Sequence, residues 1–146
     1  MVKDSKIIEF GPGSGHNALY TAFLEPACYY LVDGNKKGVQ DTKKLLSQYS
    51  IPNLEVIFSL FLSYKTEEKF DIVWAEGCLP RQTDPIKLLK HLSSFTKVGG
   101  IFVVTTNNGI SYLSEIIRRL GSFMNLDKTS PLNEQLSLLR PFFREH

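Results

Sequence analysis

The sequence is poor in the residues that form metal sites and disulfide bonds. Its 146 residues include two cysteines, Cys28 and Cys78, and three scattered histidines. It contains no Cys-x-x-Cys motif, so we expect a buried, reduced pair of cysteines rather than a disulfide or a zinc site. Without a visible cluster of ligand residues, no metal site is predicted.

The chain also lacks long apolar runs and a strong excess of charge. No apolar run approaches the ~20 residues that cross a bilayer, and the charged N-terminus has no apolar signal core. The net charge of +2 is too small to indicate a nucleic acid or a membrane surface as partner. With 42% hydrophobic and 22% charged residues, the composition is that of a soluble globular protein. We therefore expect a cytoplasmic protein with no nucleic-acid or membrane partner.

Glycine, by contrast, is concentrated near the start of the chain. Gly11, Gly13 and Gly15 alternate directly after an apolar run at residues 7–10, and a helix-compatible segment follows at 17–24. Glycine allows a positive φ and lets a ligand approach the backbone, and a helix N-terminus adds free N–H groups and partial positive charge. The stretch therefore predicts either a ligand platform or a strand–helix turn that is merely rich in glycine.

Apolar segments alternate with amphipathic ones along the rest of the chain. This alternation predicts an α/β fold, in which a parallel sheet carries helices on both faces. The expected strands are 7–10, 28–33, 54–58, 70–75 and 101–106, and the expected helices are about 15–25, 36–49, 85–95, 110–120 and 130–139.

Several of these helices carry apolar residues that should face the sheet. Leu19 and Phe23 lie four residues apart in the first helix. The corresponding residues are Val39, Leu46 and Tyr49 in the second helix, and Ile86, Leu88, Leu89, Leu92 and Phe95 in the third. Asp84 should cap the third helix, and Gly99-Gly100 should form a turn before the last strand.

Polar or glycine-containing segments follow four of the expected strands, at residues 11–15, 33–35, 59–60 and 76–77. In a parallel sheet these segments lie at the carboxyl ends of the strands, where ligands bind at the point of strand-order reversal. We therefore expect them to converge on one crevice.

The spacing of the glycines distinguishes between cofactors. A dinucleotide-binding turn has the pattern Gly-x-Gly-x-x-Gly, but His16 occupies the third glycine position here, and the turn has no Arg or Lys for a pyrophosphate. Residues 9–15, Glu-Phe-Gly-Pro-Gly-Ser-Gly, instead resemble the first motif of class I S-adenosylmethionine-dependent methyltransferases. Residues 31–33, 70–73 and 88–104 resemble, in order, that family's second acidic strand end, its fourth-strand motif, and its helix, Gly-Gly turn and fifth strand.

The resemblance covers about residues 6–120 and carries expectations about the fold and the cofactor. It implies a Rossmann-like, doubly wound three-layer αβα sandwich, with a mainly parallel sheet of about five strands in the order 3-2-1-4-5. It also implies that the cofactor is S-adenosylmethionine and the product S-adenosylhomocysteine. The implied cofactor-binding residues are Glu9, Gly11, Pro12, Gly13, His16, Asp33, Gly34, Asn35, Ser59, Leu60, Glu76 and Gly77.

The resemblance implies roles for some of these residues. Gly11 and Gly13 would let the backbone approach the methionine part of the cofactor, and Glu9 would help to position its amino end. Asp33 would accept hydrogen bonds from both ribose hydroxyls, although Asp-Gly-Asn can also be only a turn. The segment 59–61 falls where the family contacts adenine, but the acid that many members have there is missing. Residues 76–77 would line the methyl-donor end.

Methyl transfer requires few protein groups. Displacement at a sulfonium is accelerated mainly by alignment and desolvation, and a general base is needed only if the acceptor must lose a proton as it attacks. Glu76 and His16 are candidates for such a base by location alone, and Cys78 suits a small core residue better than a nucleophile. We therefore predict an enzyme with an unidentified, small-molecule acceptor and assign no catalytic residue.

The sequence departs from the resembled family after the fifth strand, where it offers no sixth or seventh strand, and it lacks the usual N-terminal helix and cap. We expect one domain over residues 1–146, either a fragment or a minimal member that forms a homodimer through the fifth-strand edge or the C-terminal helices. One alternative is a non-catalytic cofactor-binding module or a subunit that needs a partner. Another is an aminopropyl transferase, whose acidic loop is not evident at residues 76–80.

Overall fold

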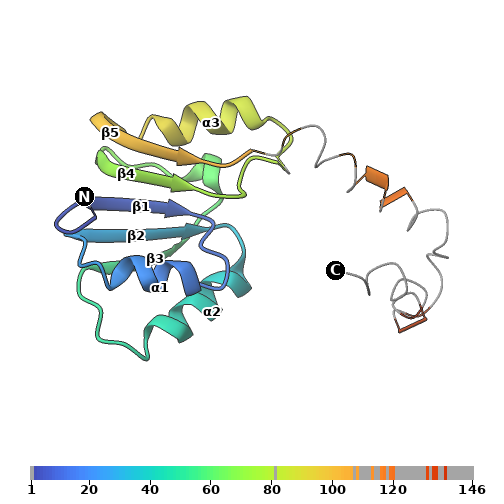
Figure 1. Ribbon diagram of the computed structural model, residues 1–146, viewed down its shortest axis with the longest axis horizontal. Coiled ribbons are helices and arrows are strands. Elements are labelled where there is room, and N and C mark those ends of the chain that lie inside the picture. Colours follow the sequence, from blue (N-terminus) through green and yellow to red (C-terminus); the bar gives the residue numbers. More distant parts are fainter. Residues whose placement is uncertain are drawn as a thin grey trace. The chain divides into compact units, whose positions relative to one another are not determined.

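The computed structural model describes residues 2–80 and 82–106, together with residues 108, 113, 116, 117, 119, 120, 131, 133, 134 and 137. Its contacts divide the chain into two compact units, Met1–Thr106 and Asn107–His146, and each is considered by itself. The expectation of one domain over residues 1–146 stays a prediction. The first unit contains the sheet and the helices labelled in Figure 1.

The short apolar segments form one parallel sheet. In the described part of the chain this sheet has five strands in the order β3-β2-β1-β4-β5, and each neighbouring pair is parallel. The arrows of Figure 1 accordingly all point the same way. The α/β fold class and the strand order 3-2-1-4-5 are confirmed. The strands are β1 (Lys6–Phe10), β2 (Cys28–Asp33), β3 (Leu54–Phe58), β4 (Phe70–Ala75) and β5 (Thr96–Val104).

Helices connect the strands, and side chains cap two of them. The Asn35 side chain accepts hydrogen bonds from two backbone N–H groups in the first turn of α2. Asp84 accepts one from Lys87 N at the start of α3, where Pro85 takes the first helical position, so the expected cap is confirmed. The helices of the first unit are α1 (His16–Ala22), α2 (Lys36–Leu46), α3 (Pro85–Ser93) and the short 3-10 helix η1 (Phe61–Ser63).

The sheet buries a separate apolar cluster on each face, and α3 lies on the opposite side from α1 and α2 (Figure 1). This burial on both faces explains why the strands are continuously apolar in sequence. The cluster under α1 and α2 contains Ile7, Ala18, Ala22, Tyr29, Leu31, Leu46 and Ile72. The cluster under α3 includes Ile8, Phe10, Val32, Phe70, Val73, Leu88 and Leu92.

Three residues expected to face the sheet are exposed instead. The exposed fractions are 56% for Phe23, 42% for Tyr49 and 59% for Ile86. Phe23 and Tyr49 contact each other edge to face, with ring centroids 5.6 Å apart. The helix α1 turns its small residues, Ala18 and Ala22, toward the sheet, and α2 ends before Tyr49. The expected inward positions of these three side chains were therefore wrong.

The Gly99-Gly100 pair lies within β5 and not in a turn before it. The strand begins at Thr96, before the expected residue 101, and its register with β4 shifts across the glycine pair. Gly99 has a φ of +80°, as expected for a bulge that adds residues to one strand. The expected turn is therefore a bulge inside a longer strand.

The second unit contains parts of the two remaining expected helices. Leu113, Ile116, Ile117 and Leu120 are helical and exposed, and residues 133, 134 and 137 are helical within the expected 130–139 segment. The expected start of the first of these helices, at residue 110, lies outside the described residues.

Candidate functional site

The backbone turns sharply at the carboxyl end of β1. Gly11, Gly13 and Gly15 have φ angles of +76°, +61° and +82°, a region that L-residues with a side chain rarely adopt. Gly15 N donates a hydrogen bond to the Pro12 carbonyl at 2.9 Å and is the N-cap residue of α1. Pro12 is buried, whereas Gly13 is exposed. The strand, glycine turn and helix predicted from the sequence are present.

The glycines of this turn differ in what surrounds them. A Cβ built on Gly11 would lie 2.9 Å from Cys78 Sγ and 3.5 Å from the Phe61 ring. A Cβ on Gly13 would meet no described atom within 4 Å. Close packing therefore requires the first glycine, while a side chain at Gly13 would point into open space.

The carboxyl end of β2 places an acid beside this turn. Asp33 is 8% exposed, and its Oδ1 accepts a hydrogen bond from Asn35 N at 2.8 Å. The Asn35 oxygen caps α2, so this side chain also has a structural role. A Cβ on Gly34 would lie 3.3 Å from the Leu60 side chain and 3.6 Å from the Ser59 carbonyl. The ends of β2 and β3 are therefore in contact, as the sequence predicted.

A cavity of about 420 Å³ opens at these two strand ends. Its acidic part is Asp33, and its apolar part comes from the segment 60–62. This combination suits a ligand that has both hydroxyl groups and a flat apolar ring. The cavity is lined by Asp33, Gly34, Asn35, Leu60, Phe61, Leu62, Ser63 and Gln82.

Glu9 lies buried beside the glycine turn, with an exposed fraction of 9%. The Tyr29 hydroxyl, on β2, donates a hydrogen bond to Glu9 Oε2. Burial raises the pKa of Glu9, the Tyr29 hydrogen bond lowers it, and the nearby Glu76 carboxylate raises it further. Burial and the Glu9 charge raise the pKa of Tyr29 far above its usual value, so the phenol stays a donor. Among the described residues, no ion pair includes Glu9.

Glu76 and Gly77 follow β4 on the exposed side of this region. Trp74 Nε1 donates to Glu76 Oε2 at 3.4 Å. Gly77 N donates to Thr105 Oγ1 at 2.7 Å, which joins the ends of β4 and β5. The Glu76 carboxylate acts electrostatically on Glu9 and contributes to its raised pKa.

Cys78 is a buried residue of this region. Its Sγ lies 2.9 Å from the Phe10 carbonyl and donates a hydrogen bond to it. Burial, together with the Asp33 and Glu9 charges, raises the pKa of the thiol to about 12. A thiolate is therefore scarce at neutral pH, which favours the packing role expected for Cys78 over a nucleophilic one.

Four of the twelve predicted residues, Asp33, Gly34, Asn35 and Leu60, line the cavity, and the other eight, His16 and Ser59 among them, do not. His16 is exposed and its Nδ1 lies 2.8 Å from Ser14 Oγ. Ser59 directs its hydroxyl to the Leu60 carbonyl at 3.0 Å and is not among the residues that line the cavity. No contact joins either side chain to Asp33 among the described residues. The roles assigned to the twelve residues stay predictions.

Sequence reasoning missed other residues that form or support this region. Leu62, Ser63 and Gln82 line the cavity, but their sequence context is that of ordinary loop residues. Tyr29 is read as a strand aromatic, and Thr42 as one polar residue among the lysines of α2. The structure shows both to be buried and bonded to the site. Only the contacts that these residues make in the folded chain identify them as part of this region.

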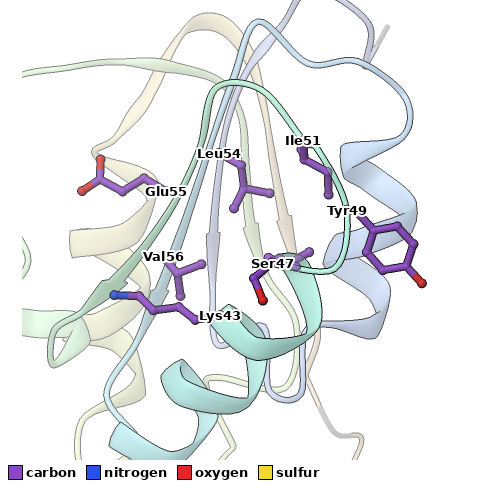
Figure 2. A pocket seen from close by; sticks show the side chains of 8 residues that line it. Lys43, Ser47, Tyr49, Ile51, Leu54, Glu55 and Val56 are labelled. Carbon is purple, nitrogen blue, oxygen red and sulfur yellow. The ribbon is translucent and has the colours of Figure 1, made fainter.

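A larger hollow elsewhere in the described part of the chain does not coincide with the predicted residues. A cavity of about 450 Å³ lies beside the end of α2, and Figure 2 shows the side chains that line it. Lys43 approaches it from α2 and Ser47 from directly after that helix, while Leu54, Glu55 and Val56 approach it from the amino half of β3. None of the twelve predicted residues lines it. Cavity volume alone therefore does not locate the site.

No described helix is long and apolar enough to cross a membrane. No group of three described His, Cys, Asp or Glu side chains is arranged to hold a metal ion.

The family comparison matches most of the chain. A family model described as a methyltransferase domain matches residues 1–137. No curated protein matches the sequence.

Solved structures of methyltransferases share the fold. PKMT2 from Rickettsia typhi, in complex with AdoHcy, superposes with a TM-score of 0.76 at 22% identity, over 96% of this chain and 28% of that one. YcgJ from Bacillus subtilis gives 0.68 at 19% identity, over 82% and 52%. A putative methyltransferase from Thermoplasma acidophilum gives 0.63 at 19% identity, over 79% and 49%. This chain therefore spans between about a quarter and a half of the length of these proteins.

Proposed function

The chain belongs to the methyltransferase-domain family, and from this premise we propose that it binds S-adenosylmethionine and transfers the methyl group to an acceptor. The single observation that carries the proposal is the junction at the carboxyl ends of β1, β2 and β3. There, a cavity with a carboxylate and an apolar wall lies beside a glycine turn in which the Cβ position of Gly13 is open. AdoHcy, the demethylated form of this cofactor, is bound by the related PKMT2 structure.

The residues present fit the two halves of this cofactor. Asp33 offers a carboxylate to the ribose hydroxyls, and Leu60 and Phe61 offer an apolar surface to the adenine. The open space at Gly13 suits the amino-acid half, which a side chain at this position would obstruct. Phe61 lines the cavity and also lies next to Gly11. The proposed adenosine site and the proposed amino-acid site are therefore adjacent.

Two acids near the glycine turn, Glu9 and Glu76, suit the positive charge of the cofactor. The Glu76 carboxylate acts electrostatically on Glu9, and no described cation neutralises Glu9. An ammonium or a sulfonium near them would relieve their mutual repulsion.

When bound, S-adenosylmethionine supplies an activated methyl group. The protein holds it in line with the acceptor and excludes water from the path. We keep Glu76 and His16 only as candidate bases, because neither has a partner that prepares it for proton transfer among the described residues.

The acceptor is proposed to be a small molecule rather than a nucleic acid, which the net charge of +2 does not favour. We also propose a cytoplasmic location, since Cys28 and Cys78 are both free thiols.

Homodimerisation through β5 is proposed because Val98 and Ile101 on this edge strand are exposed. Light scattering that gives a monomer mass at high protein concentration would contradict the dimer.

Calorimetric titration with S-adenosylhomocysteine tests the cofactor. We expect saturable binding by the wild-type chain, at one site per chain. If no heat of binding is seen and the protein is folded by circular dichroism, the proposed function is wrong. Binding without methyl transfer to any member of an acceptor panel would favour a cofactor-binding module instead.

A further inference from the structure

The inner side of α2 contacts the glycine turn at the end of β1. Thr42 is fully buried, although its neighbours Asp41 and Lys43 are exposed. Its Oγ1 donates a hydrogen bond to the Gly13 carbonyl at 3.1 Å. This bond joins two residues that lie 29 positions apart in the sequence. A buried hydroxyl without a partner is costly, so the bond is favoured to persist.

The contact is tight over a full helical turn. A Cβ built on Gly15 would lie 2.9 Å from the Thr42 methyl group. Four residues before Thr42, a Cβ on Gly38 would lie 3.3 Å from the Gly13 carbonyl oxygen and 3.2 Å from Asp33 Oδ2. Gly38 and Thr42 therefore form one ridge on α2, because residues four apart lie on the same face of a helix. This ridge contacts both the glycine turn and the acid of β2.

We propose that Thr42 is a positioning residue for cofactor binding. It holds the Gly13 carbonyl against α2, so that the rest of the Gly13 backbone faces the open space where the amino-acid half would bind. The Gly38–Thr42 ridge thereby sets the separation between the glycine turn and Asp33. Thr42 does not itself contact the cofactor in this proposal. The inference rests on the proposed function, because it assigns the open space at Gly13 to that ligand.

A comparison of two ligands separates this role from a general structural one. S-adenosylhomocysteine contains the adenosine and the amino acid, whereas methylthioadenosine keeps the adenosine and the sulfur but lacks the amino acid. Thr42→Val keeps the shape and the methyl group but removes the hydroxyl. We expect this variant to bind S-adenosylhomocysteine about fivefold more weakly, the loss expected for one hydrogen bond. Its affinity for methylthioadenosine should change by less than about twofold.

Two further variants act as controls in the same titrations. Thr42→Ser keeps the hydroxyl and should restore S-adenosylhomocysteine affinity to within about twofold of wild type. Thr66→Val removes a hydroxyl that accepts a backbone bond from Glu68 N in a loop before β4, and should leave both affinities unchanged. Urea unfolding of each variant gives the folded fraction, by which the affinities are corrected.

The affinities measured in these titrations test whether Thr42 positions the glycine turn. Wild-type affinity in Thr42→Val, or an equal loss for both ligands, would overturn the positioning role and leave the proposed function intact. An equal loss in Thr42→Ser and Thr42→Val would assign the effect to side-chain packing and not to the hydroxyl, which also contradicts the proposal. Failure of the wild-type chain to bind S-adenosylhomocysteine would overturn the proposed function and this assignment with it.

Discussion

Two glycine-rich stretches of this chain look alike in sequence but differ in what surrounds them. Gly11, Gly13 and Gly15 follow β1, and Gly99 and Gly100 lie in the bulge of β5. A Cβ on Gly100 would lie 2.9–3.0 Å from three backbone oxygens, those of Phe70, Asp71 and Lys97. A Cβ on Gly13 would meet no described atom within 4 Å. The second stretch requires glycine so that β4 and β5 can pair closely. At Gly13, in the first stretch, there is room for a ligand.

The acid beside each stretch shows the same contrast. Asp71 pairs with Lys97 and accepts a hydrogen bond from Lys6 N, and these partners hold its pKa below the usual value. Glu9 is buried with Tyr29 as its hydrogen-bond donor, and burial raises its pKa. An acid that is satisfied by the protein is structural. An acid that is buried without a cation costs stability, which is a reason to seek a ligand there.

The largest effect expected from this comparison is on stability, for Gly100→Ala. The new Cβ has no room between the three backbone oxygens, so the β4–β5 pairing must shift. We expect the free energy of unfolding to fall by roughly 2–4 kcal/mol in urea titrations. A loss below about 0.5 kcal/mol would show that the bulge adapts, and that its glycines are not structurally required.

The next largest effect is on binding, for Asp33→Asn. The amide keeps an oxygen for Asn35 N but removes the charge that would receive the ribose hydroxyls. We expect the affinity for S-adenosylhomocysteine to fall roughly 5- to 100-fold in calorimetry. The matched control, Asp71→Asn, removes the acid beside the other glycine stretch and should bind as wild type. If both variants bind equally well, Asp33 does not belong to the site.

A matched pair of glycine substitutions sharpens the comparison further. Gly13→Ala and Gly99→Ala each force a side chain into a positive φ, +61° and +80°, with open space around the Cβ. Both should lose about 1–2 kcal/mol of unfolding free energy. Only Gly13→Ala should also weaken S-adenosylhomocysteine binding, because its Cβ enters the proposed ligand space. Equal affinities in the two variants would contradict that assignment.

The contrast between the two glycine stretches also explains which parts of the fold and of the candidate site the sequence predicts. The apolar run at residues 7–10 and the glycines after it predict a buried strand and a turn, since both signals are local. The end of β2 at Asp33 was predicted for the same reason. The strand order came from the resemblance and was confirmed.

What could not be predicted depends on contacts between distant segments. The bulge at Gly99-Gly100 arises from the pairing of β5 with β4, and in sequence it reads as a turn. Thr42 and Tyr29 become part of the site only because α2 and β2 lie against the glycine turn and Glu9. Phe23 is exposed because the alanines of α1 face the sheet, and a pattern of residues four apart does not distinguish the two faces.

The smallest expected effect is a difference in pH dependence between the two acids. The folded state raises the pKa of Glu9 above its ordinary value of 4.5, so Glu9 binds its proton more tightly in the folded chain. Its contribution to stability is therefore fully present below pH 4.5 and is lost as the pH rises through the folded pKa. Glu9→Gln keeps an acceptor for Tyr29 and removes this loss. Relative to wild type, the variant should gain unfolding free energy as the pH rises above 4.5.

Asp71 should behave in the opposite sense. Its pKa is lowered in the folded chain from the ordinary value of 3.8, so its contribution is present above that pH and is lost as the pH falls through the folded pKa. Asp71→Asn should therefore be less stable than wild type near neutral pH and approach it in acid, by a small amount because the pair is partly exposed. Urea titrations of both variants between about pH 3 and pH 7 test the two signs together. If Glu9→Gln and Asp71→Asn change with pH in the same direction, the two acids do not differ as their surroundings imply. The burial of Glu9 would then give no sign of a cationic ligand.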